Sequence, residues 1–285
     1  MYIGRARVCD AVGRVIQTLP EGESIYGVTS LENRLYLLRG NKSSEQIEVY
    51  DIDSYDLLRC LTVRNLVPRD IDDIVACGHN RCAYISDHSQ SSVHRVALPD
   101  AVVTRWPVND KPARLSLTAT HSVLVTCDKD RQVKEFSTDG QLLQVLTLPQ
   151  DVVSPWHTIQ LSSGEFIVCH GNRDDQLHRV CLIGSDGSVV NSYGGPRGSG
   201  RQQMDVPAHL TVDRNEFVFV VDLNNCRVLL LSPMLTYVRE VMSRKQLRWK
   251  PLRVHLDSDR RRLYVADNEF KLGKFTAGRV AVVSL

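Results

Sequence analysis

A short motif recurs along this 285-residue chain at a nearly constant spacing. In each copy a proline opens a run of apolar residues, and these prolines are Pro68, Pro112, Pro155, Pro207 and Pro251. Successive prolines stand 44, 43, 52 and 44 residues apart, and a sixth copy opens at residues 24–28 (SIYGV), 44 residues before the first proline. A period near 44 residues with strand-like patterning is typical of a β-propeller in which each repeat forms one blade. The sequence therefore predicts an all-β fold, a six-bladed propeller.

Each copy contains four short apolar runs separated by turn residues, as expected for a blade of four antiparallel strands. The third copy is the clearest, with runs at 115–117, 123–125, 133–136 and 142–146 and an Asp139-Gly140 turn between the last two. Asp-Gly between apolar runs is a strong hairpin signal. We expect one domain over residues 1–285, with blades near 24–61, 68–106, 112–146, 155–193, 207–241 and 251–285.

The last repeat has only three strands before the chain ends. Residues 13–19 (GRVIQTL) match the pattern of a fourth strand and are similar to residues 140–146. We expect this N-terminal strand to complete the last blade and close the ring, because closure removes exposed sheet edges. The place of residues 1–12 stays open.

Composition limits the classes of function. The 35 basic and 33 acidic residues nearly balance, so no global charge argument for nucleic acid follows. No apolar run approaches the ~20 residues of a membrane span, and the N-terminus lacks the apolar segment of a secretory signal. The eight cysteines include no Cys-x-x-Cys pair. We expect a cytoplasmic location, free thiols and no membrane contact.

The fifth repeat is similar to an NHL repeat. It has a Gly-rich segment at 193–200, then Pro207, an apolar strand ending in Asp222, and the sequence Asn225-Cys226-Arg227-Val228. The other copies match more weakly. In that family, six-bladed propellers commonly form the C-terminal domain of TRIM-type ubiquitin ligases and translational regulators, and they bind partner proteins or RNA. The resemblance implies a recognition module here, without the ligase half.

In a propeller the first strands of the blades begin around the mouth of the central channel. Polar and aromatic residues at these positions are the predicted partner-binding residues: Tyr26, Arg69, Asp70, Arg114, Trp156, His157, His209 and Arg253. Arginine and aromatic residues are enriched in binding hot spots, and they also suit single-stranded RNA. The alternative, that Trp156 packs in the wall and the arginines pair with nearby aspartates, stays open.

A second cluster is basic and contains one aromatic residue. The RNA-binding candidates are Arg197, Arg201, Arg244, Lys245, Arg248, Trp249 and Lys250. Local basic residues around an aromatic ring favour anion or nucleic-acid binding. An ordinary solvated loop would have the same composition, and acidic residues such as Asp174 and Glu269 on the same face weaken the RNA interpretation.

Enzyme and metal interpretations find less support. His157 and His209 in adjacent blades invite comparison with propeller lyases that bind zinc through channel histidines, but a matching third histidine is missing. No nucleophile elbow or phosphate loop is present. We therefore expect no catalytic residue, no metal and no cofactor. A metal-dependent lyase or hydrolase is the third alternative.

The sequence thus predicts a non-enzymatic recognition module that binds a partner protein or peptide through the channel-mouth face. The propeller itself is expected to be monomeric, with oligomerisation through segments outside this sequence as the alternative. It could be the target-recognition part of a TRIM-type ubiquitin ligase. The alternative is binding of single-stranded RNA on the same face.

Overall fold

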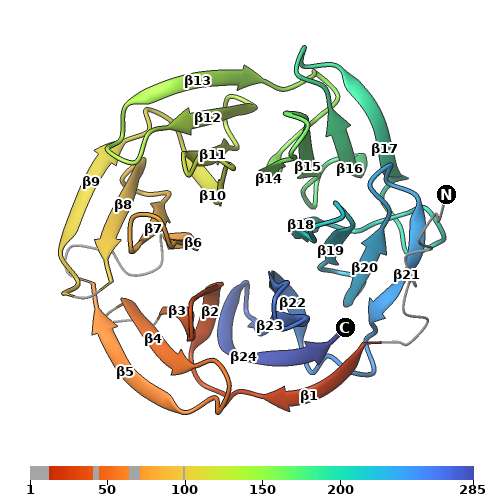
Figure 1. Ribbon diagram of the computed structural model, residues 1–285. Helices are drawn as coiled ribbons and strands as arrows, with labels where there is room; N and C mark the ends of the chain where they lie inside the picture. The colour runs from red at the N-terminus through yellow and green to blue at the C-terminus, as the bar shows by residue number, and fades with distance from the viewer. Residues whose placement is uncertain (1–12, 41–44, 64–70, 99) are drawn as a thin grey trace, which may run out of the picture.

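The structure is a computed structural model that describes residues 13–40, 45–63, 71–98 and 100–285. Figure 1 shows six sheets arranged like blades around one central channel, and each sheet has four antiparallel strands. Within the described ranges there is no helix, and therefore none that could cross a membrane. The predicted all-β, six-bladed propeller is confirmed.

Three blades come from the first half of the chain. The first contains β2 (Ser24–Leu31), β3 (Arg34–Gly40), β4 (Glu45–Asp51) and β5 (Leu57–Thr62). The second contains β6 (Ile71–Cys77), β7 (Cys82–Asp87), β8 (Ser92–Ala97) and β9 (Val103–Pro107). The third contains β10 (Pro112–Leu117), β11 (Val123–Cys127), β12 (Gln132–Phe136) and β13 (Leu142–Thr147).

The remaining blades come from the second half. The fourth contains β14 (Pro155–Gln160), β15 (Phe166–His170), β16 (Leu177–Ile183) and β17 (Val189–Pro196). The fifth contains β18 (Pro207–Val212), β19 (Val218–Asp222), β20 (Arg227–Leu231) and β21 (Tyr237–Met242). The sixth contains β22 (Lys250–Asp257), β23 (Arg262–Lys271), β24 (Lys274–Ser284) and, from the other end of the chain, β1 (Arg14–Thr18).

The ring is closed by the N-terminal strand, as predicted. β1 pairs antiparallel with β24, so the order in the last sheet is β1-β24-β23-β22. Leu19, directly after β1, is 1% exposed and packs in a cluster with Ile25 of the first blade and Tyr264 of the sixth. The seam between the two ends of the chain therefore has β hydrogen bonds and a buried apolar contact.

Burial falls from the channel outward. The second strands β7, β11, β15 and β19 are buried at every position, whereas the outer strands β5 and β13 are mostly exposed. The inner strands are covered on both faces because neighbouring blades pack against each other. One apolar cluster joins Phe219 of the fifth blade to Val254 of the sixth. The core is thus a series of layers between blades, and apolar burial there supplies much of the stability.

Side chains of the first strands also bond neighbouring blades together. Four of these side chains accept a hydrogen bond from a backbone N–H of the adjacent blade: Thr29, Asp73, His157 and His255. The Ser116 hydroxyl instead donates to the Thr158 carbonyl of the next blade. A buried backbone group without a partner would be costly. These polar residues therefore help to fix the order and spacing of the blades.

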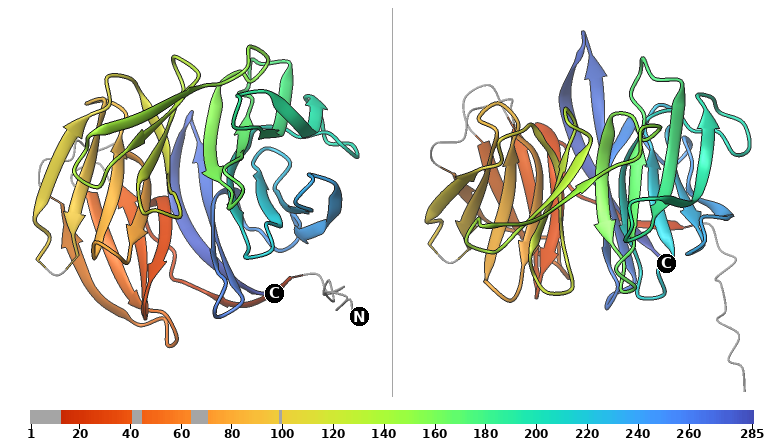
Figure 2. Two further views of the ribbon diagram at one scale, coloured as in Figure 1. Left: turned by 45° about the horizontal axis from the view of Figure 1, so that its top comes forward. Right: turned by 90° about the horizontal axis from the view of Figure 1, so that it is seen from above.

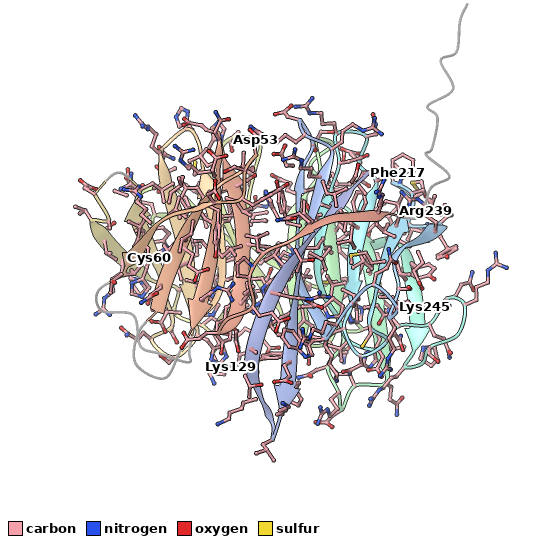
Figure 3. All side chains as sticks on the ribbon, turned by 90° about the horizontal axis from the view of Figure 1, so that it is seen from below. Asp53, Cys60, Lys129, Phe217, Arg239 and Lys245 are labelled. Atoms are coloured by element: carbon pink, nitrogen blue, oxygen red, sulfur yellow. The ribbon has the colours of Figure 1, made fainter. Side chains whose placement is uncertain are left out.

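One hairpin projects beyond the others. β23 and β24 continue past the last residues paired with β22, where Lys250 lies opposite Asn268. Figure 2 shows this hairpin, residues 269–277 and here called the arm, rising from one face of the disc. Figure 3 places Lys129 at that same face and Asp53 at the opposite face. The arm therefore marks the face that carries the site described next.

Candidate functional site

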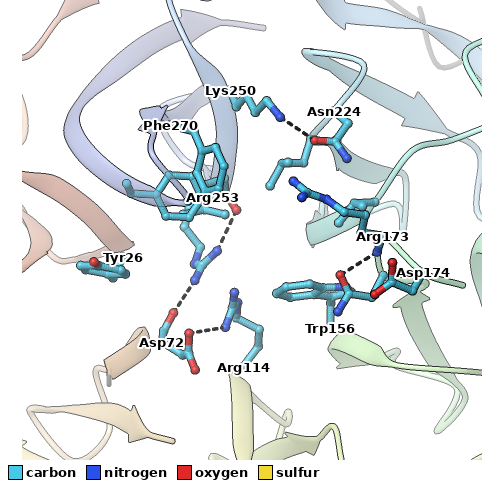
Figure 4. Close-up of a pocket in the computed structure, with 16 residues that line it drawn as sticks. Tyr26, Asp72, Arg114, Trp156, Arg173, Asp174, Asn224, Lys250, Arg253 and Phe270 are labelled. Atoms are coloured by element: carbon cyan, nitrogen blue, oxygen red, sulfur yellow. Dashed lines mark hydrogen bonds and ion pairs between the residues drawn. The ribbon is translucent and has the colours of Figure 1, made fainter. Parts of the chain in front are cut away.

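A pocket of about 500 Å³ lies at the mouth of the central channel, beside the arm. All six blades contribute to its lining, with Tyr26, Asp72, Arg114, Trp156, Asn224 and Arg253 in blade order. Figure 4 shows the side chains of Arg114 and Arg253 converging on Asp72, with Trp156 at one side. Side chains far apart in the sequence thus meet at one place.

Local backbone geometry positions the lining residues. In every blade the register between the first and second strands shifts just after the first strand begins, for instance between Ile71 and Asp73 and between Pro155 and His157. A bulge of this kind re-aims a side chain. The extra residues include Tyr26, Asp72 and Trp156, which line the pocket. The residue after the bulge is His157 in the fourth blade and His209 in the fifth, both buried beneath the pocket, whereas in the third and sixth blades it is Arg114 and Arg253, which line the pocket.

Two buried guanidinium groups form the floor. Arg114 is 3% exposed and Arg253 is 1% exposed. Nη1 of Arg114 donates to the Ala113 carbonyl at 2.8 Å and lies 3.2 Å from Oδ1 of Asp72. Arg253 donates to the Leu252 and Asp72 carbonyls. Burial, and after it the charge of Arg114, lower the pKa of Arg253 to about 9, so Arg253 is still cationic at neutral pH.

Asp73 balances this charge from below. It is 2% exposed, and its Oδ2 accepts the backbone N–H of Leu115 at 3.1 Å. Its carboxylate lies 3.4 Å from Nε of Arg253 and 3.6 Å from Nε2 of His209. Buried charges in proteins are normally paired, and Asp73 with Asp72 supplies the pairing here.

Internal cations cover the aromatic faces. The guanidinium of Arg114 lies 5.2 Å from the ring centre of Trp156, whose indole N–H donates to the Gly171 carbonyl. On the arm side, Nζ of Lys250 lies 5.6 Å from the ring of Phe270 and donates to Oδ1 of Asn224 at 2.7 Å. These contacts hold both rings at the pocket.

The two channel histidines lie deeper. His157 and His209 are stacked with ring centres 4.0 Å apart, and both are buried. His157 uses both ring nitrogens: Nδ1 accepts the N–H of Leu210 and Nε2 donates to the Leu115 carbonyl. Only a neutral ring can make this pair of bonds. Burial, with the neighbouring His209, accordingly holds the pKa of His157 well below its usual value.

The hydrogen bonds of His157 make it a poor ligand for a metal ion. Asp73, His157 and His209 bring one potential ligand atom each to within 4.8 Å of the others. A histidine ligand needs a free nitrogen lone pair, however, and both nitrogens of His157 are already hydrogen-bonded to the backbone. The trio therefore fits a structural role better than a metal centre.

The structure brings together only some of the predicted partner-binding residues. Tyr26, Arg114, Trp156 and Arg253 line the pocket. His157 and His209 belong to the wall beneath it, while Arg69 and Asp70 lie outside the described residues. Pro68 lies there too, and the first strand of the second blade begins at Ile71.

Sequence reasoning missed several pocket residues. Asp72 lines the pocket and Asp73 lies beneath it. Both follow the start of the second blade's first strand, and the apolar run of residues 74–76 behind them could have signalled their place. Phe270 and Asn224 had no comparable signal. They lie on the arm and on the loop after β19, which repeat spacing does not place.

The basic cluster lies largely apart from the pocket. Of its residues, Lys250 reaches the pocket, whereas Arg244 and Lys245 are exposed, and Figure 3 shows Lys245 at the outer edge of the molecule. Arg248 lies over the Trp249 ring, 4.9 Å from its centre, and pairs with Glu21. Arg197 pairs with Asp205 at 3.0 Å, and Arg201 is exposed. Acidic partners thus reduce the charge that the cluster offers.

No protein-family model matches the chain, and no curated protein sequence matches it. Among solved structures, it is similar to a streptogramin B lyase with 13% identity and a TM-score of 0.62, covering 92% of this chain and 83% of that one. It is also similar to virginiamycin B lyase from Staphylococcus aureus, with 11% identity and a TM-score of 0.63, covering 94% of this chain and 89% of that one. A third similar structure is a PQQ-bound aldose sugar dehydrogenase from Streptomyces coelicolor, with 14% identity and a TM-score of 0.65, covering 95% of this chain and 98% of that one. At these identities the likeness shows the fold alone.

These comparisons correct one expectation. The prediction that the chain is not an enzyme was wrong, because solved structures of the same architecture include lyases and a dehydrogenase. A six-bladed propeller of this kind therefore gives no ground for excluding catalysis. The comparisons do not show the NHL similarity, which stays a prediction.

Proposed function

We propose that the chain is a recognition domain that binds a segment of a partner protein in the channel-mouth pocket. The observation that carries this proposal is the convergence of all six blades on one pocket of about 500 Å³. Pockets that bind ligands usually lie between about 300 and 1,000 Å³. The volume suits a few side chains of an extended segment.

The residue types at the pocket also suit a protein partner. Trp156, Tyr26 and Phe270 provide aromatic surface, and Arg114 and Arg253 provide hydrogen-bond donors. Tryptophan, tyrosine and arginine are the residues most enriched in binding hot spots, particularly at the desolvated centre of an interface. Trp156 is held by its indole hydrogen bond, so little rotamer freedom would be lost on binding.

The test is a selection of short random peptides on the purified chain, followed by measured dissociation constants. Replacing Trp156 by Ala should weaken the selected peptides about thirtyfold, the effect of a 2 kcal/mol hot spot. Trp249→Ala removes the same side chain outside the pocket and serves as the matched control. Equal affinity of the Trp156→Ala variant and the wild type would contradict the proposal.

A second candidate function, binding of single-stranded RNA, has one specific observation in its favour. The Arg248 guanidinium lies over the Trp249 ring, and both residues line a pocket with the exposed Arg244. Lys245, the next residue in the sequence, is exposed too. A stacked ring with cations around it can hold a base and its phosphate. RNA binding here would weaken steeply with salt and be lost on changing Arg244 and Lys245 to Glu. Salt-insensitive binding unaffected by those changes would remove this candidate.

The NHL-like pattern of the fifth blade supports a narrower form of the first proposal, in which the chain is the target-recognition part of a TRIM-type ubiquitin ligase. In that setting the full-length protein would ubiquitinate a partner that binds the pocket. The Trp156→Ala variant should then leave that partner unmodified, while self-ubiquitination continues. Unchanged modification of the partner would contradict this narrower form.

A further inference from the structure

The guanidinium groups at the pocket floor have more N–H donors than the protein itself uses. A guanidinium has five N–H donors. In Arg114, whose side chain is 3% exposed, Nη1 is the one guanidinium nitrogen that has a polar partner among the described residues. The Nε atom of Arg114 is buried without a hydrogen bond, whereas that of Arg253 faces Asp73 at 3.4 Å. Buried polar groups are nearly always satisfied, so the unused donor of Arg114 at the pocket floor points to a missing acceptor.

The aromatic rings argue against a cationic ligand. Arg114 already lies over Trp156, and Lys250 lies over Phe270. A cation entering the pocket would have to displace these internal cations from the rings and would lie beside two buried guanidiniums. An anion would meet favourable charge and free donors at the same place.

Asp72 marks where such an anion would bind. Its side chain is 32% exposed, and its Oδ1 lies 3.2 Å from Nη1 of Arg114. Asp73 differs, since its side chain is 3% exposed and it is fixed by the Leu115 N–H and by Arg253. Asp73 is thus part of the wall, whereas the Asp72 carboxylate can move toward solvent and leave Arg114 to another acceptor.

From these observations, and resting on the proposed function, we infer that the bound segment carries an oxyanion that takes the place of the Asp72 carboxylate at Arg114 and lies beside Arg253. An aspartate or glutamate side chain, a free C-terminal carboxylate and a phosphorylated residue share this chemistry. Arginine binds carboxylate and phosphate groups through two parallel hydrogen bonds, which gives specificity as well as affinity.

The first measurement uses peptides selected on the wild-type chain, with dissociation constants determined by calorimetry. Each peptide should contain an acidic group whose neutral replacement weakens binding about tenfold to a hundredfold, as expected for a charge-assisted hydrogen bond. Amidating the C-terminus tests the terminal carboxylate, Glu→Gln or Asp→Asn in the peptide tests the side chain, and competition by inorganic phosphate tests the phosphate.

The second measurement changes the protein at a partly exposed position, so that folding is preserved. Asp72→Asn removes the internal competitor and should tighten binding of the acidic peptide about fivefold. Asp174→Asn removes the same charge elsewhere in the pocket lining and is the matched control, expected to change affinity less. Arg114→Gln should weaken the acidic peptide but not its neutral analogue.

The outcomes separate the two proposals. Peptides that need Trp156 but no acidic group, or that bind no better to the Asp72→Asn variant, would overturn this inference and leave the proposed function intact. Displacement of the peptide by an oligouridylate that itself needs Trp156 would also overturn it, with RNA as the ligand. If no selected peptide depends on Trp156, both proposals fall.

Discussion

At the scale of single residues, two buried histidines in this protein each bridge a donor and an acceptor in their neutral form. His157 accepts from Leu210 N and donates to the Leu115 carbonyl. In His170, Nδ1 donates to the Val153 carbonyl at 3.2 Å and Nε2 accepts Nε of Arg179 at 3.3 Å. One donor and one acceptor on the same ring exist only without the second proton. Protonation of either ring would break one of its two bonds, which for His157 link the fourth blade to its neighbours.

Stability should therefore fall on acidification. Burial, and then Arg179, lower the pKa of His170 to about 4. The unfolded chain, with a histidine pKa near ~6.5, binds protons first, so stability is lost as pH falls from that value toward the folded pKa. His170 alone should cost about 2 kcal/mol between roughly pH 7 and pH 5. Urea unfolding at the two pH values measures this loss.

The matched variants are His170→Asn, which should lose less stability on acidification, and His79→Asn at an exposed histidine, which should behave as the wild type. Identical pH dependence in all three proteins would contradict the assignment of His170 as a neutral bridge.

At the scale of elements, the arm should serve binding rather than folding. Its tip residue Leu272 is 99% exposed, while Phe270 and Phe275 line the pocket. Replacing residues 270–276 by Asn-Gly would join the paired residues Glu269 and Ala277 through a two-residue hairpin turn. The free energy of unfolding should change by less than about 1 kcal/mol, as for exposed positions. Peptide affinity should fall at least about fivefold.

The control for the arm is Leu272→Ser, which changes the tip without changing the pocket lining. Both stability and peptide affinity should match the wild type in this variant. A loss of affinity equal to that of the shortened arm would mean that the tip, and not the pocket wall, contacts the ligand.

How far the elements could be predicted depended on how each is stabilised. Strands covered by two neighbouring blades have continuous apolar runs, and Pro112, Pro155 and Pro207 do begin first strands. The arm is not covered in this way, and polar and apolar residues alternate in it only over residues 269–272. The site was predicted in part for a related reason. Bulges shift the register by one residue, and spacing alone cannot tell which of two adjacent side chains faces the channel.

At the scale of the whole molecule, the seam where the chain ends meet should control stability. Leu19 is 1% exposed in the cluster between the first and sixth blades, whereas Ile16 in the same N-terminal segment is 45% exposed. Leu19→Ala should lower the free energy of unfolding by about 2–5 kcal/mol because it leaves a cavity. Ile16→Ala should cost less than about 1 kcal/mol.

Chemical denaturation of the two alanine variants measures this difference. Similar losses in both would mean that β1 contributes through its backbone pairing with β24 and not through Leu19. Closure itself was predictable from the missing strand of the last repeat, because a four-stranded unit with three strands must be completed from elsewhere in the chain.

The pocket floor joins opposite sides of the disc. Arg114 belongs to the third blade and Arg253 to the sixth, whereas most contacts in the fold link each blade to the next. A molecule bound by both guanidiniums would link the third and sixth blades across the ring. Its binding should slow the separation of β1 from β24, although it touches neither strand. A ligand bound in the central pocket would therefore make the ring harder to open at its outer seam.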